Sequence, residues 1–362
     1  EPGGAASRLA AIGRVRAVTM AVLLLLALIA AVWGATQAKG APADSVPPIA
    51  SADRQANEDL VLYDRIVTRV AQGENYYRTA ADELRSGNYP LKPFVAFRPP
   101  TLTAVAAWLG RPALLALQYV LFAAMVAAWW VRLDQQFADS GRRISATMLA
   151  AAGLAVAFSG KYLLLHEVWA GTLIAISLAL HRPNHWGWSV AAAALALAIR
   201  ELALPYVLLM AAFALYRRSW RELGAWFALV LLFAAAMAWH AGEVARVVLP
   251  SDPASPGWAA LGGWEGVLRT FHLAGPLRWL PMEAGAAAIV LALFGWASWR
   301  SRTGLAATLL YLGYGLAFML FGRANNFYWG LMVTPAFLIG FAFLPRALSD
   351  LAAEIRTRHT VA

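Results

Sequence analysis

The sequence predicts an all-α membrane protein with about ten transmembrane helices in a single domain, 1–362. Hydrophobic residues make up 60% of the 362 positions and charged residues only 14%, well below the roughly 25% of a soluble domain. The hydrophobic residues gather into long runs, and a helix of roughly 20 such residues crosses a bilayer. The net charge is +10, but the arginines stand at the ends of these runs and form no single stripe that would bind nucleic acid.

Ten runs are long enough, or nearly long enough, to be spanning helices. The first follows Arg8, Arg14 and Arg16, which is also the arrangement of a signal peptide. Because this run is longer than an ordinary signal-peptide core, we expect a retained membrane anchor. The predicted spans are 17–38, 112–131, 145–160, 167–181, 187–200, 202–216, 223–240, 283–299, 304–321 and 327–345.

Basic residues at alternate ends of the runs predict the orientation in the membrane. Loops rich in lysine and arginine stay on the cytoplasmic side. We therefore expect a multi-pass protein of a bacterial inner membrane with both termini in the cytoplasm. The clusters that predict this side are 8–16, 132–143, 182, 217–221, 300–302 and 346–358.

Two polar stretches, 39–100 and 241–281, are predicted to be loops on the opposite, periplasmic side. The first holds eight of the twenty acidic residues of the chain. Within it we expect amphipathic helices on the membrane surface, the clearest at 57–72, where apolar residues recur every three or four positions and Asn57 is placed to cap the start. The prolines at 99–100 predict an extended passage back into the membrane, because residues before proline avoid the helical conformation.

Four basic or potentially basic side chains are predicted at the outer ends of apolar segments, beneath the first loop. An ionisable group at membrane depth costs roughly 2.5–3.5 kcal/mol on insertion scales, so it indicates a functional site. Several cations near few acids suit a phosphate or pyrophosphate ligand. The alternative is that they reach the interface or pair with neighbours, as Arg200 could with Glu201. The four are Lys161, His166, Arg200 and Arg323.

Several kinds of site are excluded or not indicated. The chain has no cysteine, which excludes disulfides, thiolate metal sites and cysteine nucleophiles. It has no DxD or HExxH motif, so neither a metal nor another cofactor is indicated, and it has no P-loop or serine-hydrolase motif. Tyrosines such as Tyr76, Tyr77 and Tyr328 are expected either in an interfacial aromatic belt or stacked on a sugar.

The first loop resembles that of the GT-C superfamily of membrane glycosyltransferases. The resemblance lies in Asp59, in Tyr63 four residues on, in Gly73, and in Arg98 with the two prolines after it. Glu167 stands at the second acidic position of these relatives. Their acidic pair appears here in inverted order, and Arg98 replaces their lysine.

This resemblance implies a reaction as well as a fold. It implies that a sugar moves from a polyprenyl-phosphate donor to a lipid, glycan or protein acceptor of the cell envelope. The donor's lipid tail would enter between the helices from the surrounding membrane lipids. The "REL" at 200–202 and the "NNFYWG" at 325–330 are similar to the bacterial branch that uses polyprenyl-phosphate mannose.

The predicted site assigns a role to each candidate residue. Asp59 is implied to be the general base that takes the proton of the acceptor hydroxyl, with inversion at the anomeric carbon. Asp64 is the rival base. The residues predicted to bind the donor phosphate are Arg98, Lys161, His166, Arg200 and Arg323. The residues predicted to contact the acceptor or the sugar are Asp64, Glu74, Tyr76, Tyr77, Glu167, Glu201 and Tyr328.

Two other functions remain open. A transporter or lipid flippase would also hold charges in the membrane, but it predicts internal repeats and helices broken near mid-membrane. The sequence contains no convincing repeat. A non-enzymatic scaffold whose loop binds a periplasmic partner would leave Lys161, Arg200 and Arg323 unexplained. For Asp59 itself, the alternative role is to stabilise a helix N-terminus.

Overall fold

The all-α class predicted from the sequence is confirmed. Helices account for 78% of the structure, and no β-strand occurs among the residues described. An isolated bridge joins Lys92 and Ala254. The structure is a computed structural model that describes residues 7–40, 49–137, 139–257 and 261–356.

Four helices in the described part of the chain are long and apolar enough to cross a membrane. A fifth candidate is the pair Thr334–Ala342 and Leu344–Arg356, which bend by 42° where they meet. A multi-pass membrane protein fits these lengths, whereas the number of ten spans stays a prediction. The four long helices are α1 (Arg14–Gly40), α5 (Arg111–Asp134), α10 (Trp220–Ala245) and α13 (Arg302–Phe321).

Apart from α2, which has 23 residues but carries many charges, the remaining helices are shorter, and several of them are apolar. The α-helices are α2 (Ile49–Ala71), α3 (Tyr76–Ser86), α4 (Thr101–Leu109), α6 (Ser140–Gly153), α7 (His166–Leu180), α8 (Gly187–Ile199), α9 (Leu204–Tyr216), α11 (Gly263–Leu273), α12 (Met282–Ser298), α14 (Thr334–Phe337) and α15 (Leu344–Arg356). The 3-10 helices are η1 (Phe94–Ala96), η2 (Ala157–Ser159), η3 (Glu201–Ala203), η4 (Pro276–Trp279), η5 (Ala324–Met332) and η6 (Leu338–Ala342).

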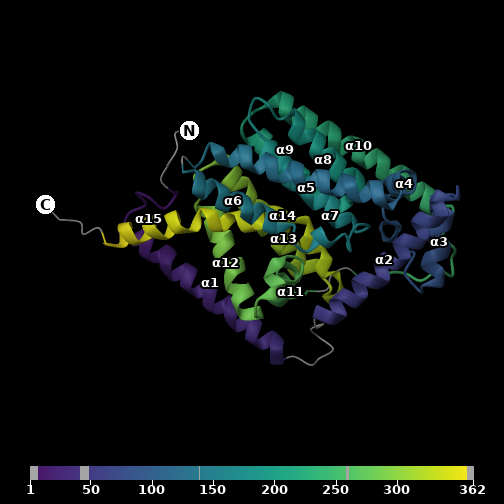
Figure 1. Ribbon diagram of the computed structural model, residues 1–362, viewed down its shortest axis with the longest axis horizontal. Coiled ribbons are helices and arrows are strands. Elements are labelled where there is room, and N and C mark those ends of the chain that lie inside the picture. Colours follow the sequence, from purple (N-terminus) through teal and green to yellow (C-terminus); the bar gives the residue numbers. More distant parts are fainter. Residues whose placement is uncertain (1–6, 41–48, 138, 258–260, 357–362) are drawn as a thin grey trace.

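The helices form a bundle with a cap at one end (Figure 1). α5, α8, α9 and α10 make one side, where α9 and α8 pack on α10, and α1, α11, α12 and α13 make the other. The cap consists of α2 and α3, with α4 beside them, at one end of the longest axis. The start of α1 and the whole of α15 lie toward the opposite end.

The core of the bundle is built around α7. Every residue from His166 to Ala179 is buried, because α5, α8 and η5 pack around this helix. A glycine permits the close contact with η5, since a Cβ at Gly171 would overlap the carbonyl of Leu331. Small residues let backbones approach in this way in membrane proteins. The first residue of α7 is therefore held at a fixed place beneath the cap.

The segment 327–345 is predicted as one spanning helix, and this prediction is wrong. The chain forms η5, α14 and η6 in succession and then continues as α15. This path brings the backbone of η6 directly onto α12, where a Cβ at Gly340 would overlap the carbonyl of Ala292. A Cβ at Gly295 would in turn overlap the carbonyl of Gly340. The break is thus maintained by a contact between segments that are far apart in sequence.

The first predicted loop differs from expectation in two ways. α2 begins at Ile49, so Asn57 lies inside the helix and does not cap its start. The apolar face of α2 also packs on protein instead of resting on the membrane surface, because Leu62 and Ile66 are buried in one cluster with Leu84 of α3. The two helices therefore stabilise each other as a cap.

The second predicted loop, 241–281, is only partly a loop. α11 lies within it, and all residues from Gly266 to Leu273 are buried in the bundle. The stretch 246–257 lies against the cap, where the guanidinium of Arg85 donates to both carboxylate oxygens of Asp252 at 2.8 and 2.7 Å. This stretch thereby becomes part of the same end of the molecule as α2 and α3.

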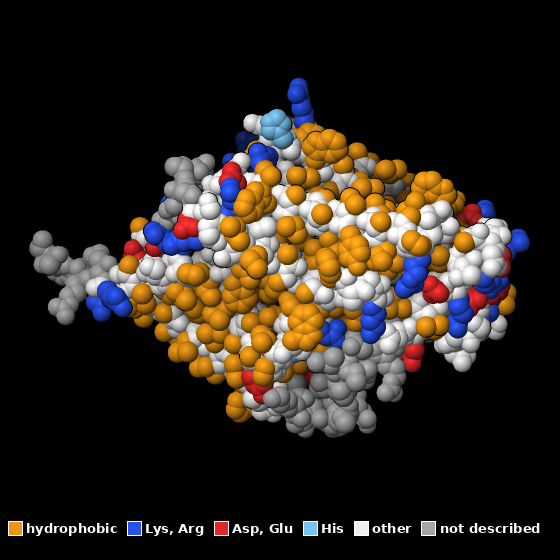
Figure 2. Space-filling model, in the orientation of Figure 1, with side chains coloured by type: hydrophobic (Ala, Val, Ile, Leu, Met, Phe, Trp, Pro, Cys, Tyr) orange, Lys and Arg blue, Asp and Glu red, His pale blue; other side chains and the backbone are white. Residues whose placement is uncertain are grey.

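The surface divides along the longest axis. Hydrophobic side chains cover the middle of the face shown in Figure 2, and charged side chains gather mainly toward its two ends. On α1, Leu23, Leu26 and Ile29 are 53%, 54% and 55% exposed. A large apolar surface of this kind is expected where a protein contacts lipid.

Candidate functional site

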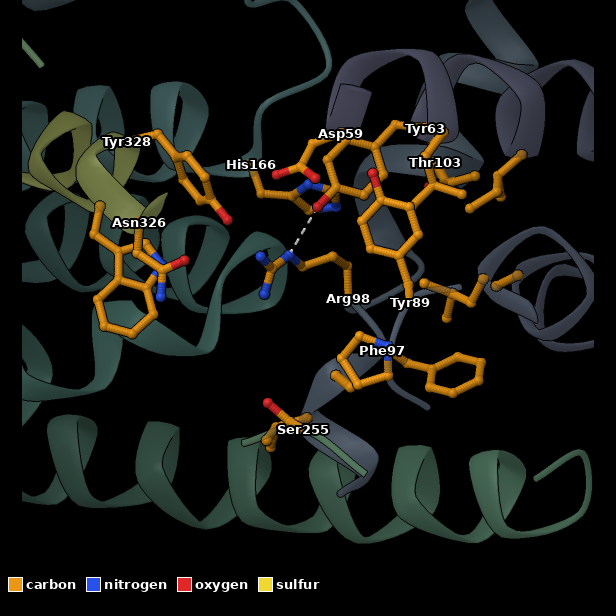
Figure 3. Close-up of a pocket in the computed structure, with 18 of the residues that line it drawn as sticks. Asp59, Tyr63, Tyr89, Phe97, Arg98, Thr103, His166, Ser255, Asn326 and Tyr328 are labelled. Atoms are coloured by element: carbon orange, nitrogen blue, oxygen red, sulfur yellow. Dashed lines mark hydrogen bonds between the residues drawn. The ribbon is translucent and has the colours of Figure 1, made fainter. Parts of the chain in front are cut away.

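A cavity of about 280 Å³ lies under the cap. Its walls come from α2, α3 and the loop that follows, from the first residue of α7, from 255–256, and from η5. Figure 3 shows Asp59, Arg98 and His166 converging on this space, with Tyr328 facing them from the side of η5. Segments from three quarters of the chain's length therefore meet at one place.

Asp59 presents a largely buried carboxylate to the cavity. It lies on α2, and 7% of its surface is exposed. The side chain of Tyr89, from the loop after α3, hydrogen-bonds to it. Burial and the negative charge of Asp59 both raise the pKa of Tyr89, so the tyrosine stays protonated and is the donor in this bond. The carboxylate is thus oriented by a neighbour while it still borders the cavity.

Arg98 is the best-positioned cation of the cavity. Its Nε donates to the hydroxyl of Tyr63 at 3.2 Å, and its carbonyl accepts from the hydroxyl of Tyr76 at 2.6 Å. Both tyrosines belong to the cap, so the cap fixes the backbone and the guanidinium of Arg98 together. A guanidinium held in this way can bind a phosphate through two parallel hydrogen bonds.

His166 adds a buried imidazole to the same wall. It begins α7, is 2% exposed and meets the ring of Tyr63 edge-on, with 5.4 Å between the ring centroids. The carbonyls of Pro99 and Leu164 lie close to the ring. Neither ring nitrogen, however, makes a hydrogen bond of normal geometry with a described residue. The imidazole therefore borders the cavity with both ring nitrogens buried.

Arg323 forms the opposite wall together with η5. Its guanidinium donates to the hydroxyl of Ser255 at 3.3 and 3.4 Å, to the carbonyl of Gly257 at 2.9 Å, and to the carbonyl of Pro256. These bonds fasten the second loop across the cavity. Arg323 therefore supplies positive charge to the cavity and also holds one of its walls.

The charges of the cavity are unequal in number. Among the described side chains that line it, Asp59 is the acid, the two fixed cations are Arg98 and Arg323, and the imidazole of His166 lies beside them. Such a site can hold an anion against the arginines and still offer a carboxylate that accepts a proton beside it. The described residues contain no group of three or more His, Asp or Glu side chains that could hold a metal ion.

Arg200, Glu167 and Glu201 do not line this cavity, although they are predicted at the site. They form a buried ion cluster behind it, in which Arg200 Nε donates to Glu167 Oε1 at 2.8 Å and Arg200 Nη1 donates to Glu201 Oε1. Arg200 and Glu167 are each 1% exposed. Glu201 Oε1 of this cluster lies 4.0 Å from Nη1 of Arg98.

Four other predicted residues also lie away from the cavity. Lys161 is exposed, with its ammonium 5.5 Å from the centroid of a neighbouring tyrosine ring. Asp64 and Glu74 form ion pairs with arginines at 3.4 and 2.6 Å on the outside of the cap. Tyr77 is buried between the cap and α10, with its hydroxyl 3.0 Å from Nδ1 of His240. Tyr76 and Tyr328, in contrast, do line the cavity.

Some residues line the cavity without having been predicted there. They are Thr103, Ser255 and Asn326, and Tyr89, which the sequence suggests only as one of several loop aromatics. For Tyr89 a signal exists, because it stands in the chain break "SGNYP" of the acidic loop. Thr103 and Asn326 stand near the starts of α4 and η5 and Ser255 stands in a loop, and no local pattern marks them.

A second, apolar cavity of about 360 Å³ adjoins the first, between α9 and α13. Pro205, Phe318 and Phe321 contribute to its lining, and the paired Arg200 and Glu201 also line it. Val95 and Trp329 line both cavities, so the two share a wall. An amphipathic ligand could therefore place its polar group in the first cavity and its apolar part in the second.

Comparison with known proteins yields no match: no protein-family model, no curated protein and no solved structure matches the chain. What the cavity can do is therefore inferred from its own side chains.

Proposed function

We propose that the protein is a membrane glycosyltransferase of the GT-C type, which moves a sugar from a polyprenyl-phosphate donor to a hydroxyl group of a cell-envelope acceptor. The observation that carries this proposal is the cavity under the cap, where the carboxylate of Asp59 accompanies Arg98, Arg323 and His166. The site would face the periplasm of a bacterial inner membrane, as the distribution of arginines predicts.

The proposed reaction uses these side chains in two roles. Asp59 takes the proton of the acceptor hydroxyl as its oxygen forms a bond to the anomeric carbon, which contributes roughly 10²–10⁴-fold to the rate. The bond from that carbon to the phosphate oxygen breaks, and polyprenyl phosphate leaves. Arg98 and Arg323 stabilise the negative charge that develops on this leaving group. Attack from the side opposite the phosphate inverts the anomeric carbon.

The adjoining apolar cavity supports a lipid-linked donor. The phosphate would lie near Arg98, and the first isoprene units would pass Val95 and Trp329 into the space between α9 and α13. Burial of apolar surface is worth roughly 25 cal/mol per Å², so a lipid tail would add substantially to donor binding. A soluble sugar nucleotide would leave this apolar space without an occupant.

The test is a transfer assay with the purified protein in proteoliposomes. Radiolabelled polyprenyl-phosphate mannose, arabinose and aminoarabinose are offered with envelope glycans and lipids as acceptors, and the wild type is compared with Asp59→Asn. We expect transfer by the wild type and a loss of roughly 10²–10⁴-fold in Asp59→Asn.

A matched control comes from the same helix. Asp64→Asn removes an acid five residues further on that pairs with Arg111 on the outside of the cap, and it should leave the rate close to that of the wild type. Equal activity of Asp59→Asn and the wild type would show that Asp59 is not the base. Loss of transfer in Asp64→Asn alone would show that Asp64 is the base and that Asp59 is not.

A lipid flippase or small-molecule transporter is the second candidate, and the break at 324–342 favours it. Transporters place their substrates at discontinuous helices, and this stretch is a succession of short helical segments. A flippase would move labelled polyprenyl-phosphate sugar across the bilayer without an acceptor. The proposed transferase would instead release polyprenyl phosphate only when an acceptor is present.

A further inference from the structure

A third cavity, of about 650 Å³, lies apart from the two described above, at the end of the bundle opposite the cap. It opens between α6, the turn that joins α12 to α13, and the first two turns of α15. Its floor is aromatic: Trp299 and Phe343 stack with 4.3 Å between their ring centroids, and Phe137 stacks on Phe343 at 5.5 Å. The proposed transfer reaction makes no use of this cavity.

Three arginines from three different segments line this cavity. They are Arg142 of α6, Arg300 of the turn and Arg346 of α15. Arg346 is paired with Asp350 at 2.9 Å. The side chains of Arg142 and Arg300 make no hydrogen bond or ion pair with any described residue.

The acid that lines the cavity has a structural role. Asp139 caps α6, and its carboxylate accepts from the backbone N–H of Arg142 at 3.0 Å. Arg346 is matched by Asp350, and even with the Asp139 carboxylate counted, Arg142 and Arg300 leave the cavity positive. An anion is therefore the ligand that its charge favours.

An apolar surface continues from the cavity along α6. Arg142, Ser145 and Leu149 face the cavity, whereas Ile144 and Met148 lie on the adjacent face and are 48% and 66% exposed. Residues four apart stack on one side of a helix, so these two side chains form a strip that runs away from the cavity. A small soluble anion would use the arginines but not the strip.

We propose that this cavity binds an anionic phospholipid, with its phosphate against Arg142 and Arg300 and its acyl chains along Ile144 and Met148. Basic pockets between membrane helices are known to hold phospholipid headgroups. The volume falls in the range of ligand pockets, roughly 300–1,000 Å³. The aromatic floor would contact the glycerol backbone of the lipid.

The experiment measures lipid binding to the full chain in detergent by native mass spectrometry. Phosphatidylglycerol is compared with phosphatidylcholine of the same acyl chains, for the wild type and for Arg142→Gln/Arg300→Gln. Each charge near a lipid surface is worth about 1 kcal/mol, so we expect phosphatidylglycerol binding to weaken about five-fold in each single variant and about thirty-fold in the double variant. Binding of phosphatidylcholine should not change.

The matched control is Arg302→Gln/Arg356→Gln, which removes two exposed arginines at the same end of the molecule that do not line the cavity. Equal weakening in both double variants would reduce the effect to general attraction by surface charge and overturn the proposal. Unchanged phosphatidylglycerol binding in Arg142→Gln/Arg300→Gln would overturn it as well. Glycerophosphoglycerol and inorganic phosphate serve as competitors. If either of them displaces the lipid when present at the same concentration as the lipid, the cavity is a site for a soluble anion and the proposal is overturned.

Discussion

Two groups of charged side chains lie close together near the cap and differ in what surrounds them. Asp59 and Arg98 border a cavity, whereas Glu167, Arg200 and Glu201 are packed against one another behind it. Each group combines an arginine with at least one acid, and the sequence predicts both for the same site. In the buried cluster the guanidinium is already matched by two carboxylates, which offsets the large cost of burying its charge.

This difference separates a structural charge from a functional one. A buried arginine whose hydrogen-bonding groups are directed at carboxylates stabilises the fold and has little left to offer a ligand. Arg98 is held mainly by the neutral Tyr63 and Tyr76, and its one carboxylate neighbour, Glu201, lies at 4.0 Å, so most of its hydrogen-bonding capacity is left for a ligand. Substitutions in the two groups should therefore change different properties.

Replacement of Arg200 should have the largest effect on stability. Arg200→Gln leaves the carboxylates of Glu167 and Glu201 buried without their cation, and removal of one partner of a buried ion pair costs about 3–5 kcal/mol. The free energy of unfolding, measured by tryptophan fluorescence in detergent with increasing denaturant, should fall by that amount.

The control for Arg200 is an arginine in an exposed pair. Arg246 is 74% exposed and pairs with Glu243 at 2.5 Å, so Arg246→Gln should hardly change stability. If both variants unfold at the same denaturant concentration, the cluster is not structural. Arg200 would then again be a candidate for the donor phosphate.

Replacement of Arg98 should affect donor binding instead of stability. Arg98→Gln removes the charge but keeps a hydrogen-bonding group, and a hydrogen bond to a charged group is worth about 1.5–3 kcal/mol. The KM for the polyprenyl-phosphate donor should therefore rise roughly 10- to 150-fold in the transfer assay. Arg78→Gln is the control, because Arg78 is exposed on α3 and does not line the cavity. A normal donor KM in Arg98→Gln would contradict the assignment.

The sequence predicts most of the helices but not every path between them. α1, α5, α10 and α13 are predictable because each is a long apolar run with an arginine at or next to an end. The break at 324–342 is not, since it depends on Gly340 lying against the backbone of α12 near Gly295. No property of either segment alone reveals that contact.

The site is predictable in the same uneven way. Asp59 and Arg98 stand in a polar loop that must lie outside the bilayer, and their spacing and position single them out. Arg98 and Arg200 both stand next to apolar segments at the same side, so the sequence cannot separate the ligand-facing arginine from the paired one. The distinction depends on how each helix is rotated about its own axis in the bundle. In the structure this rotation directs the guanidinium of Arg200 at the carboxylate of Glu167.

Replacement of Tyr89 should have a smaller effect on the reaction. Tyr89→Phe removes the hydroxyl that hydrogen-bonds to Asp59, and one hydrogen bond contributes about 0.5–1.5 kcal/mol. We expect kcat to fall about 2- to 12-fold while the donor KM and the unfolding midpoint stay the same. An increase in donor KM with normal kcat would show that Tyr89 binds the donor and does not position Asp59.

Loss of the pairing of Arg85 with Asp252 should give the smallest effect, and in the wild-type protein this loss should occur only in acid. Hydrogen bonds from Arg85 lower the pKa of Asp252 from 3.8 to about 2. The pKa of Asp252 is thus lower in the folded protein than in the unfolded chain. The ion pair therefore stabilises the attachment of 246–257 to the cap fully above about pH 4, and this stabilisation is lost as the pH falls toward 2.

Hydrogen exchange of the stretch 246–257, corrected for the intrinsic rate, should be constant from pH 7 to 5 and accelerate below pH 4. Asp252→Asn should exchange faster than the wild type at neutral pH and lose the acid dependence. A wild-type stretch that stays equally protected down to pH 2 would mean that it is held by other contacts, such as the hydrogen bond from the N–H of Leu91 to the carbonyl of Pro253.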